Sequence, residues 1–243
     1  MKKRIAIVDG RISEECLRAL MLRGFRVITL PPCSTLSEPI ASHPDMLIAK
    51  VKDELVTTSD YCEEAAFAIS EIYDEVRLKF HFTADSHGKS YPDDVIFNSL
   101  PLGNRLFARL ESLSPYLKEL AEANGLELIN VSQGYPACTT LKLSDEAVIT
   151  ADPGMEKLLS SYGIRVYRIE NGGIQLPPYE YGFIGGAAGV FGGCAYFLGD
   201  ASLHPSHSII KEALDRESIK PIMLSDAPLT DLGGILFIEA DLD

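Results

Sequence analysis

The chain has 243 residues, with 22 Lys and Arg against 35 Asp and Glu, which gives a formal charge of −13. A hydrophobic content of 46% is that of an ordinary globular protein and excludes a disordered chain. The acidity argues against a nucleic-acid partner, because a protein that grips a phosphate backbone needs a basic face. No apolar run approaches the roughly 18 residues of a membrane span, so no membrane partner is expected.

The first elements predicted in chain order are a strand over residues 4–8, a helix over 13–23 and a strand over 25–30. The apolar run of the first strand is shorter than the core of a secretory signal, which needs about 7–15 residues. The five cysteines are widely spaced and form no CxxC pair, which favours free thiols in a reducing compartment. We therefore expect a cytoplasmic protein.

Three segments in the middle of the chain repeat one pattern. Each starts with a ring followed by a proline, and the prolines recur every 44 to 48 residues: His43-Pro44, Tyr91-Pro92 and Tyr135-Pro136. A short apolar strand, a polar turn and a second apolar strand follow each pair, and then a helix and a third strand. A period of this size indicates an architecture of repeated β-β-α-β units.

The predicted units cover residues 43–82, 91–131, 134–170 and 183–225, the last of which is looser and rich in glycine. A C-terminal strand over 231–238 completes a fifth unit with residues 3–30. Five units that hold both chain ends in one unit describe a closed ring with few exposed strand edges. We predict the α/β class and a five-bladed β-β-α-β pseudo-fivefold propeller, a single domain of residues 1–243. The alternative, a Rossmann-type parallel sheet, conflicts with the hairpins that dominate from residue 45 onward.

This pattern resembles the pentein fold, which is the fold of the guanidino-group modifying enzymes. The resemblance covers residues 3–238 and includes a glycine-rich final strand at Gly233-Gly234-Ile235. It is most specific to an uncharacterised subgroup, through three stretches: Gln133-Gly134-Tyr135, Gly199-Asp200 and Asp231-Leu232-Gly233-Gly234. The family includes arginine deiminases, dimethylarginine dimethylaminohydrolases, agmatine deiminases and amidinotransferases. The resemblance implies a ligand site where the leading strands converge on the axis.

The resemblance also implies that the family's usual Cys-His mechanism is absent. Its enzymes carry His-Cys just after the paired glycines, and that cysteine attacks the guanidinium carbon. Leu236 and Phe237 occupy these places here, so the equivalent of the nucleophile is Phe237. The family's histidine and acid align near Pro136 and Cys138. Because Cys194 is the last cysteine, a small shift of the alignment does not restore the nucleophile, and whether the chain is an enzyme stays open.

The starts of the leading strands would face the axis and supply the candidate site. They carry a thiol, an imidazole, a phenol and three carboxylates: Cys138, His43, Tyr135, Asp45, Asp94 and Asp231. Cys138 is the candidate nucleophile and His43 the candidate base. The carboxylates and Tyr135 are candidates for binding a ligand, and carboxylates suit a cation. The structural alternative is a buried thiol, a histidine stacked on Pro44, and acids that cap turns.

We predict a small cationic ligand, a guanidino or amino compound, in an acidic axial pocket; the alternative is a non-catalytic scaffold or binding protein.

No cofactor and no metal are expected. His204 and His207 flank Pro205, which favours a helix start over a metal pair. The glycines of residues 185–193 lack the Lys and Ser or Thr of a phosphate loop. Residues 80–91 are expected to form an exposed loop. The oligomeric state stays open.

Overall fold

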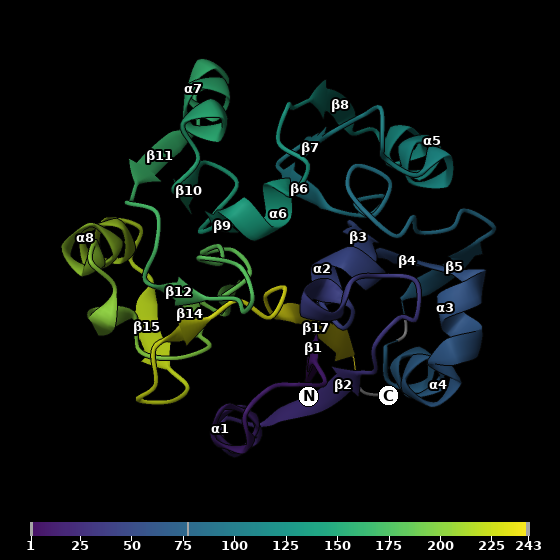
Figure 1. Cartoon of the computed structure of the whole chain (residues 1–243), viewed down its shortest axis with the longest axis horizontal. Coiled ribbons are helices and arrows are strands. Elements are labelled where there is room, and N and C mark those ends of the chain that lie inside the picture. Colours follow the sequence, from purple (N-terminus) through teal and green to yellow (C-terminus); the bar gives the residue numbers. More distant parts are fainter. Residues whose placement is uncertain (1, 77, 242–243) are drawn as a thin grey trace.

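A computed structural model describes residues 2–76 and 78–241. The chain forms five three-stranded sheets and one two-stranded sheet, which are separate from one another in the described residues. In each three-stranded sheet the middle strand pairs antiparallel with a leading strand and parallel with a third strand. Figure 1 shows these sheets around a common centre, with most of the longer helices, α1, α4, α5, α7 and α8, toward the outside.

The N-terminal unit takes its leading strand from the other end of the chain. It contains β1 (Lys2–Asp9), α1 (Glu14–Leu22) and β2 (Phe25–Leu30), and β17 (Leu236–Asp241) pairs antiparallel with β1. The register places Ile5 opposite Ile238, and both side chains are buried. The predicted pairing of a C-terminal strand with the N-terminal unit is therefore confirmed, but the predicted bounds of 231–238 are wrong, because the strand runs from Leu236 to Asp241.

The second unit contains α2 (Pro44–Leu47), β3 (Ala49–Val51), β4 (Glu54–Thr58), α3 (Ser59–Glu64), α4 (Ala66–Glu75) and β5 (Lys79–Thr83). A single-turn helix, η1 (Glu38–Ile40), precedes it. The prediction of a loop over residues 80–91 is partly wrong, because β5 extends to residue 83. The strand forms since β4 offers it a parallel partner over five residue pairs.

The third unit contains β6 (Ser99–Leu102), β7 (Arg105–Ala108), α5 (Pro115–Ala123) and β8 (Glu127–Asn130). The fourth contains α6 (Pro136–Thr139), β9 (Thr140–Lys142), β10 (Ala147–Thr150), α7 (Pro153–Ser161) and β11 (Arg165–Arg168). Ser114 and Asp152 cap α5 and α7 by accepting hydrogen bonds from backbone N–H groups in the first helical turn. Proline follows each cap, where its missing N–H costs nothing.

The fifth unit contains β13 (Ala188–Phe191), β14 (Cys194–Phe197), η2 (Ala201–Leu203), α8 (His207–Arg216) and β15 (Lys220–Met223). The helix start expected near His204 and His207 is confirmed. A two-stranded sheet of β12 (Ile174–Gln175) and β16 (Leu229–Thr230), which the sequence analysis did not predict, lies before and after this unit in the chain.

Two of the predicted leading strands begin with a helical turn instead. α2 and α6 start at Pro44 and Pro136, and the strands that follow begin only at Ala49 and Thr140. The prediction of a strand directly after each proline is therefore wrong. The physical reason is that proline presets a helical φ and is well tolerated at the first helical position.

The leading strands of all five three-stranded sheets line one cavity of about 510 Å³. Each contributes at least one residue: Ala49, Leu100, Leu141, Gly189 and Leu236. The middle strands lie behind them and are mostly buried, as the apolar run of residues 5–8 in β1 illustrates. No helix in the described part of the chain has the length and apolar character to cross a membrane.

Candidate functional site

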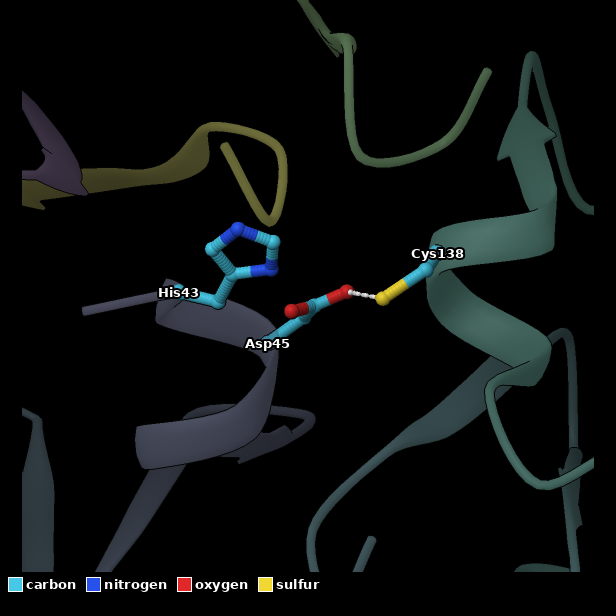
Figure 2. A group of neighbouring side chains, drawn as sticks. All are labelled: His43, Asp45 and Cys138. Atoms are coloured by element: carbon cyan, nitrogen blue, oxygen red, sulfur yellow. Dashed lines mark hydrogen bonds between the residues drawn. The ribbon is translucent and has the colours of Figure 1, made fainter. Parts of the chain in front are cut away.

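Three of the candidate side chains meet at the centre of the molecule (Figure 2). His43 directly precedes α2, Asp45 lies in α2, and Cys138 lies in α6. One donor atom of each lies within 4.8 Å of the donor atoms of the other two. The helical turns after Pro44 and Pro136 therefore bring together groups that are 93 residues apart in the case of Asp45 and Cys138.

The thiol of Cys138 donates a hydrogen bond to Asp45 Oδ2 at 2.6 Å. The second carboxylate oxygen, Oδ1, is buried and has no hydrogen-bond partner among the described residues. Burial raises the pKa of Asp45 to about 8, and the hydrogen bond from Cys138 only partly offsets this. Burial also raises the pKa of the Cys138 thiol well above its usual value, so the thiol stays protonated at neutral pH.

His43 is 1% exposed, and neither of its ring nitrogens has a hydrogen-bond partner in the described structure. Its Nε2 lies 3.9 Å from Asp9 Oδ2 and its Nδ1 lies 4.0 Å from Asp231 Oδ1. Burial lowers the pKa of His43 to about 4, although the Asp9 carboxylate opposes this shift. The imidazole is therefore neutral at physiological pH and available as a proton acceptor or a ligand.

Asp231 adds a second buried carboxylate to the group. Its Oδ2 accepts a hydrogen bond from Phe183 N at 2.8 Å and its Oδ1 accepts one from Gly233 N at 3.1 Å. Burial raises the pKa of Asp231 to about 6, against the effect of these two hydrogen bonds. A side chain at residue 186 would overlap this carboxylate, because a Cβ on Gly186 would lie 1.9 Å from Asp231 Oδ1.

The structure adds an ion pair that the sequence analysis missed. Asp9 is fully buried at the end of β1, and both of its oxygens accept hydrogen bonds from the Arg11 guanidinium. Arg11 also donates to the backbone carbonyls of Glu38 and Pro39, so the pair is held in place from two sides. The sequence feature that could have indicated this ion pair is the acid Asp9 and the base Arg11 at the end of a predicted apolar strand.

Asn98 is a second residue that the sequence analysis missed. Its amide nitrogen donates to Cys138 Sγ at 3.2 Å, and its amide oxygen accepts from the backbone N–H of Ala137 at 2.9 Å. Asn98 therefore fixes the position of α6 and of the thiol together. The asparagine stands just before β6, where a buried amide in an apolar surrounding was a usable signal.

Asp94 and Tyr135 form a separate pair. The Tyr135 hydroxyl donates to Asp94 Oδ2 at 2.9 Å, and Asp94 Oδ1 is buried without a partner in the described residues. Burial raises the pKa of both side chains. The Tyr135 ring stacks on Tyr91 at 5.8 Å between ring centres. No hydrogen bond in residues 2–76 and 78–241 joins this pair to His43, so the structure does not bring all six candidates into one contact network.

Asp45 also lines the 510 Å³ cavity and is the one acidic residue among the described residues that do so. Lys50, Lys52 and Lys142 line the same cavity. Lys142 is bound by Asp145 at 2.7 Å and by the Pro101 carbonyl at 2.9 Å. The cavity lining therefore carries one acid against three lysines, so the prediction of an acidic pocket is wrong for this cavity as a whole, and the acidic character is confined to the surroundings of Asp45.

Phe237 lies outside this group of polar residues. Its ring packs against Phe25, Phe191 and Tyr196, with centre-to-centre distances of 5.0, 5.4 and 5.1 Å. The side chain is 8% exposed and belongs to an apolar cluster between β1 and the fifth unit. Residue 237 therefore has a packing role in this chain.

Comparisons with known proteins agree with this architecture. The model of the family of unknown function DUF6873 matches residues 7–236. No curated protein matches the chain. An amidinotransferase from Microseira wollei, in the saxitoxin biosynthetic pathway, is 13% identical with a TM-score of 0.56, covering 93% of this chain and 78% of that one.

Two further solved structures are similar over almost their whole length. DDAH from Pseudomonas aeruginosa, in complex with citrulline, is 11% identical with a TM-score of 0.54, covering 93% of each chain. Agmatine deiminase from C. jejuni, with substrate bound, is 8% identical with a TM-score of 0.55, covering 99% of this chain and 96% of that one. These are pentein-fold enzymes, so the chain shares the pentein fold; at such identities the likeness shows the fold alone.

Proposed function

The chain belongs to the family of unknown function DUF6873, and from that premise we propose that it binds a small organic cation, a guanidino or amino compound, at Asp45. The observation that carries this proposal is Oδ1 of Asp45, a buried oxygen without a hydrogen-bond partner in the described residues, in a side chain that lines the central cavity. A buried carboxylate oxygen without a partner is costly, and a cationic N–H donor supplies both the missing hydrogen bond and the missing charge.

The second buried acid beside Asp45, Asp231, supports a cation at this point of the cavity, although Lys50, Lys52 and Lys142 line the same cavity. Asp45 and Asp231 repel each other, and burial raises the pKa of both. Arg11 hydrogen-bonds to Asp9, and in the described residues no Lys or Arg forms an ion pair with Asp45 or Asp231. A guanidinium or ammonium group would neutralise them. The fold supports the guanidino class in particular, because a similar structure is an agmatine deiminase with its substrate bound.

We propose that the five three-stranded sheets are the blades of a five-bladed propeller. Five sheets of one strand order, whose leading strands line one cavity, support it. In this arrangement the cavity lies on the axis and Asp45 stands at its wall. The Asp94–Tyr135 pair extends the polar surface on the side of α6.

In this proposal the chain binds its ligand but does not use the Cys-His mechanism of the guanidino-group modifying enzymes. Phe237 supports this, because it fills an apolar cluster at the position aligned with the family's nucleophile. Any reaction would use Cys138 as nucleophile and His43 as base. Their state in the free protein, a protonated thiol and a neutral imidazole, makes Cys138 unreactive until a bound cation favours its thiolate.

Thermal denaturation of the metal-free full chain with arginine, agmatine and creatine tests this function. A ligand present at about 100 times its Kd stabilises a protein by about 2.7 kcal/mol, which is a readable rise in Tm. We expect a rise with at least one of these compounds and none with methylurea, which has a neutral ureido group and no ammonium group. The rise should be lost in Asp45→Asn and kept in Asp226→Asn, which changes an exposed acid. No rise with any of the cations at millimolar concentration contradicts the proposal.

The alternative is a scaffold that catalyses nothing, and the burial of Cys138 favours it. The thiol is 3% exposed and is held by Asp45 and Asn98. Alkylation of the native protein, followed by peptide mass spectrometry, separates the two possibilities. Modification of Cys138 that accelerates with the bound cation supports a reactive thiol. A Cys138 that stays unmodified with and without ligand leaves a binding protein or scaffold.

A further inference from the structure

We propose that His43, Asp45 and Cys138 also form a binding site for a divalent transition metal ion of the zinc class. The three residues offer an imidazole nitrogen, a carboxylate oxygen and a sulfur, a donor set that zinc and cobalt accept. All three donor atoms lie within 4.8 Å of one another. This inference does not rest on the organic-cation proposal. A metal ion needs Cys138 and His43 as ligands, whereas an organic cation needs only the carboxylates.

The donor atoms are close to the spacing that such an ion requires. Zinc bonds of about 2.0–2.3 Å in a tetrahedron place the donors roughly 3.3–3.8 Å apart. The Cys138 Sγ and Asp45 Oδ2 atoms are 2.6 Å apart and are joined by the thiol proton. An ion between them would replace that proton and move the two atoms slightly apart. Figure 2 shows His43 with one ring nitrogen, Nδ1, directed to the side of Asp45 and Cys138.

The state of His43 is the independent observation that points to a ligand. The side chain is 1% exposed, and neither ring nitrogen has a hydrogen-bond partner in the described structure. Buried imidazole nitrogens are normally paired, because an unsatisfied polar group inside a protein costs about 1–3 kcal/mol. An ion bound to Nδ1 would satisfy the nitrogen that faces Asp45.

The surroundings of His43 match what a metal-binding histidine needs on its other side. Metal-bound histidines usually direct the second ring nitrogen at a carboxylate or carbonyl, which fixes the ring. His43 Nε2 lies 3.9 Å from Asp9 Oδ2, and Arg11 holds Asp9 in place with hydrogen bonds to both carboxylate oxygens. The Asp9–Arg11 pair then serves to position the His43 imidazole as a metal ligand.

Charge and coordination number are also satisfied. Binding releases the thiol proton to solvent, together with the proton that Asp45 carries below its raised pKa of about 8. The Cys138 thiolate and Asp45 carboxylate then carry two negative charges against the two positive charges of the ion. Asn98 Nδ2 donates to Sγ at 3.2 Å and would stabilise the thiolate. Asp231 Oδ1, at 4.0 Å from His43 Nδ1, is a further oxygen that can occupy the fourth position directly or through water.

Cobalt titration of the full chain, after removal of metals with a chelator, tests the site. We expect one equivalent of Co²⁺ to bind with a thiolate-to-cobalt absorption band, and one equivalent of Zn²⁺ to displace it. Cys138→Ala should abolish the band, while Cys194→Ala, at a half-buried thiol in β14, should keep it. His43→Gln should weaken binding at least 100-fold, and Asp9→Asn, which changes the positioning residue, about 10–100-fold.

Far-ultraviolet circular dichroism of each variant shows that it is folded before it is titrated. Absence of a saturable Co²⁺ or Zn²⁺ site in the natural chain overturns the proposal, and so does equal affinity in Cys138→Ala. Both outcomes are separate from the organic-cation test, since Cys138→Ala keeps the carboxylates. A Tm rise with agmatine in the Cys138→Ala protein, together with lost cobalt binding, supports both sites. The same rise without any metal binding in the natural chain overturns the metal site alone.

Discussion

The Cys138 thiol lies 2.6 Å from the Asp45 carboxylate, and this contact joins the helical turns at the start of two different repeat units. The two groups act on each other in opposite directions, because Asp45 raises the pKa of Cys138 whereas the hydrogen bond from Cys138 lowers the pKa of Asp45. Desolvation is the main cause of the raised pKa of both, and the charge of Asp45 raises that of Cys138 further. A positive charge bound beside these two groups would therefore change the protonation of both.

We expect Asp45→Asn to stabilise the ligand-free protein. Asparagine keeps the size and an acceptor for the Cys138 thiol, and it removes a buried group whose charged form is disfavoured. The gain should be about 1–3 kcal/mol in the free energy of unfolding at pH 7.5. Urea denaturation in the presence of a chelator measures it.

Asp226→Asn is the control for this measurement, since Asp226 is exposed and its replacement should change the free energy of unfolding by less than about 0.5 kcal/mol. If Asp45→Asn is instead less stable than the natural chain, the carboxylate has a compensating partner in the folded protein, and the argument for a missing cation fails.

A second prediction concerns Gly233, whose backbone packs directly on His43. A Cβ at residue 233 would lie 2.4 Å from His43 Cβ and 2.6 Å from its Cγ. Gly233→Ala should therefore destabilise the fold by about 1–3 kcal/mol more than Gly192→Ala. Both glycines have positive φ, at 68° and 57°, but a Cβ at residue 192 meets nothing within 4 Å. Comparison of the two variants therefore distinguishes the effect of overlap with His43 from the effect of backbone strain at positive φ.

Thermal and urea denaturation of the two glycine variants provide the comparison. Equal losses of stability in both would mean that strain at positive φ accounts for the whole effect and that the contact with His43 relaxes without cost. We also expect Gly233→Ala, but not Gly192→Ala, to weaken cobalt binding, because displacement of the imidazole moves one of its donors.

The repeat pattern predicted the strand order well because it depends on local features. Apolar runs, polar turns and helix caps recur in each unit, and the Ser114 and Asp152 caps start helices where the sequence places them. The pairing of β17 with β1 was also predictable, since a final strand without a local partner has to complete a unit. The short helices at Pro44 and Pro136 were not, because a single turn of four residues carries no periodicity.

The candidate site was predictable only in part. Counting residues from each proline placed His43, Asp45 and Cys138 near the axis, and the structure brings these three together. Asp9 and Asn98 were missed, because they reach the site from segments that the repeat does not align with it. Which acid touches which partner depends on the packing of units far apart in sequence, as in the contact between Asp231 and Gly186.

A third prediction concerns Phe237, at the position that the sequence resemblance aligns with the nucleophilic cysteine of the guanidino-group modifying enzymes. Phe237→Ala should lower the free energy of unfolding by about 3–5 kcal/mol, since it leaves a cavity among Phe25, Phe191 and Tyr196. Phe67→Ala is the control: Phe67 is 84% exposed and its loss should cost less than about 0.5 kcal/mol. A small effect at Phe237 would show that this cluster is loosely packed and would weaken the argument that residue 237 has a packing role.

The last prediction is a pH dependence that originates outside the candidate site. Glu54 accepts hydrogen bonds from Asn124 Nδ2 at 2.9 Å and Lys79 Nζ at 3.2 Å, and it contacts His81 Nε2 at 2.6 Å. These partners, with Asn124 first and His81 second, lower the pKa of Glu54 to about 2 from the ordinary 4.5. Because the folded state favours the carboxylate, its contribution to stability is fully present above pH 4.5 and is lost as the pH falls toward 2.

Glu54→Gln removes this charge, so we expect the variant to be less stable than the natural chain at pH 6 and the difference to shrink steadily between pH 4.5 and 2. Urea denaturation at pH 6, 4.5 and 3 measures the two free energies of unfolding. Glu127→Gln, at a glutamate whose side chain is 56% exposed beside Arg105, should lower stability much less at pH 6, because solvent screens that pair. A constant difference between the natural chain and Glu54→Gln across this range would mean that the carboxylate contributes through packing and hydrogen bonding alone, independently of its charge.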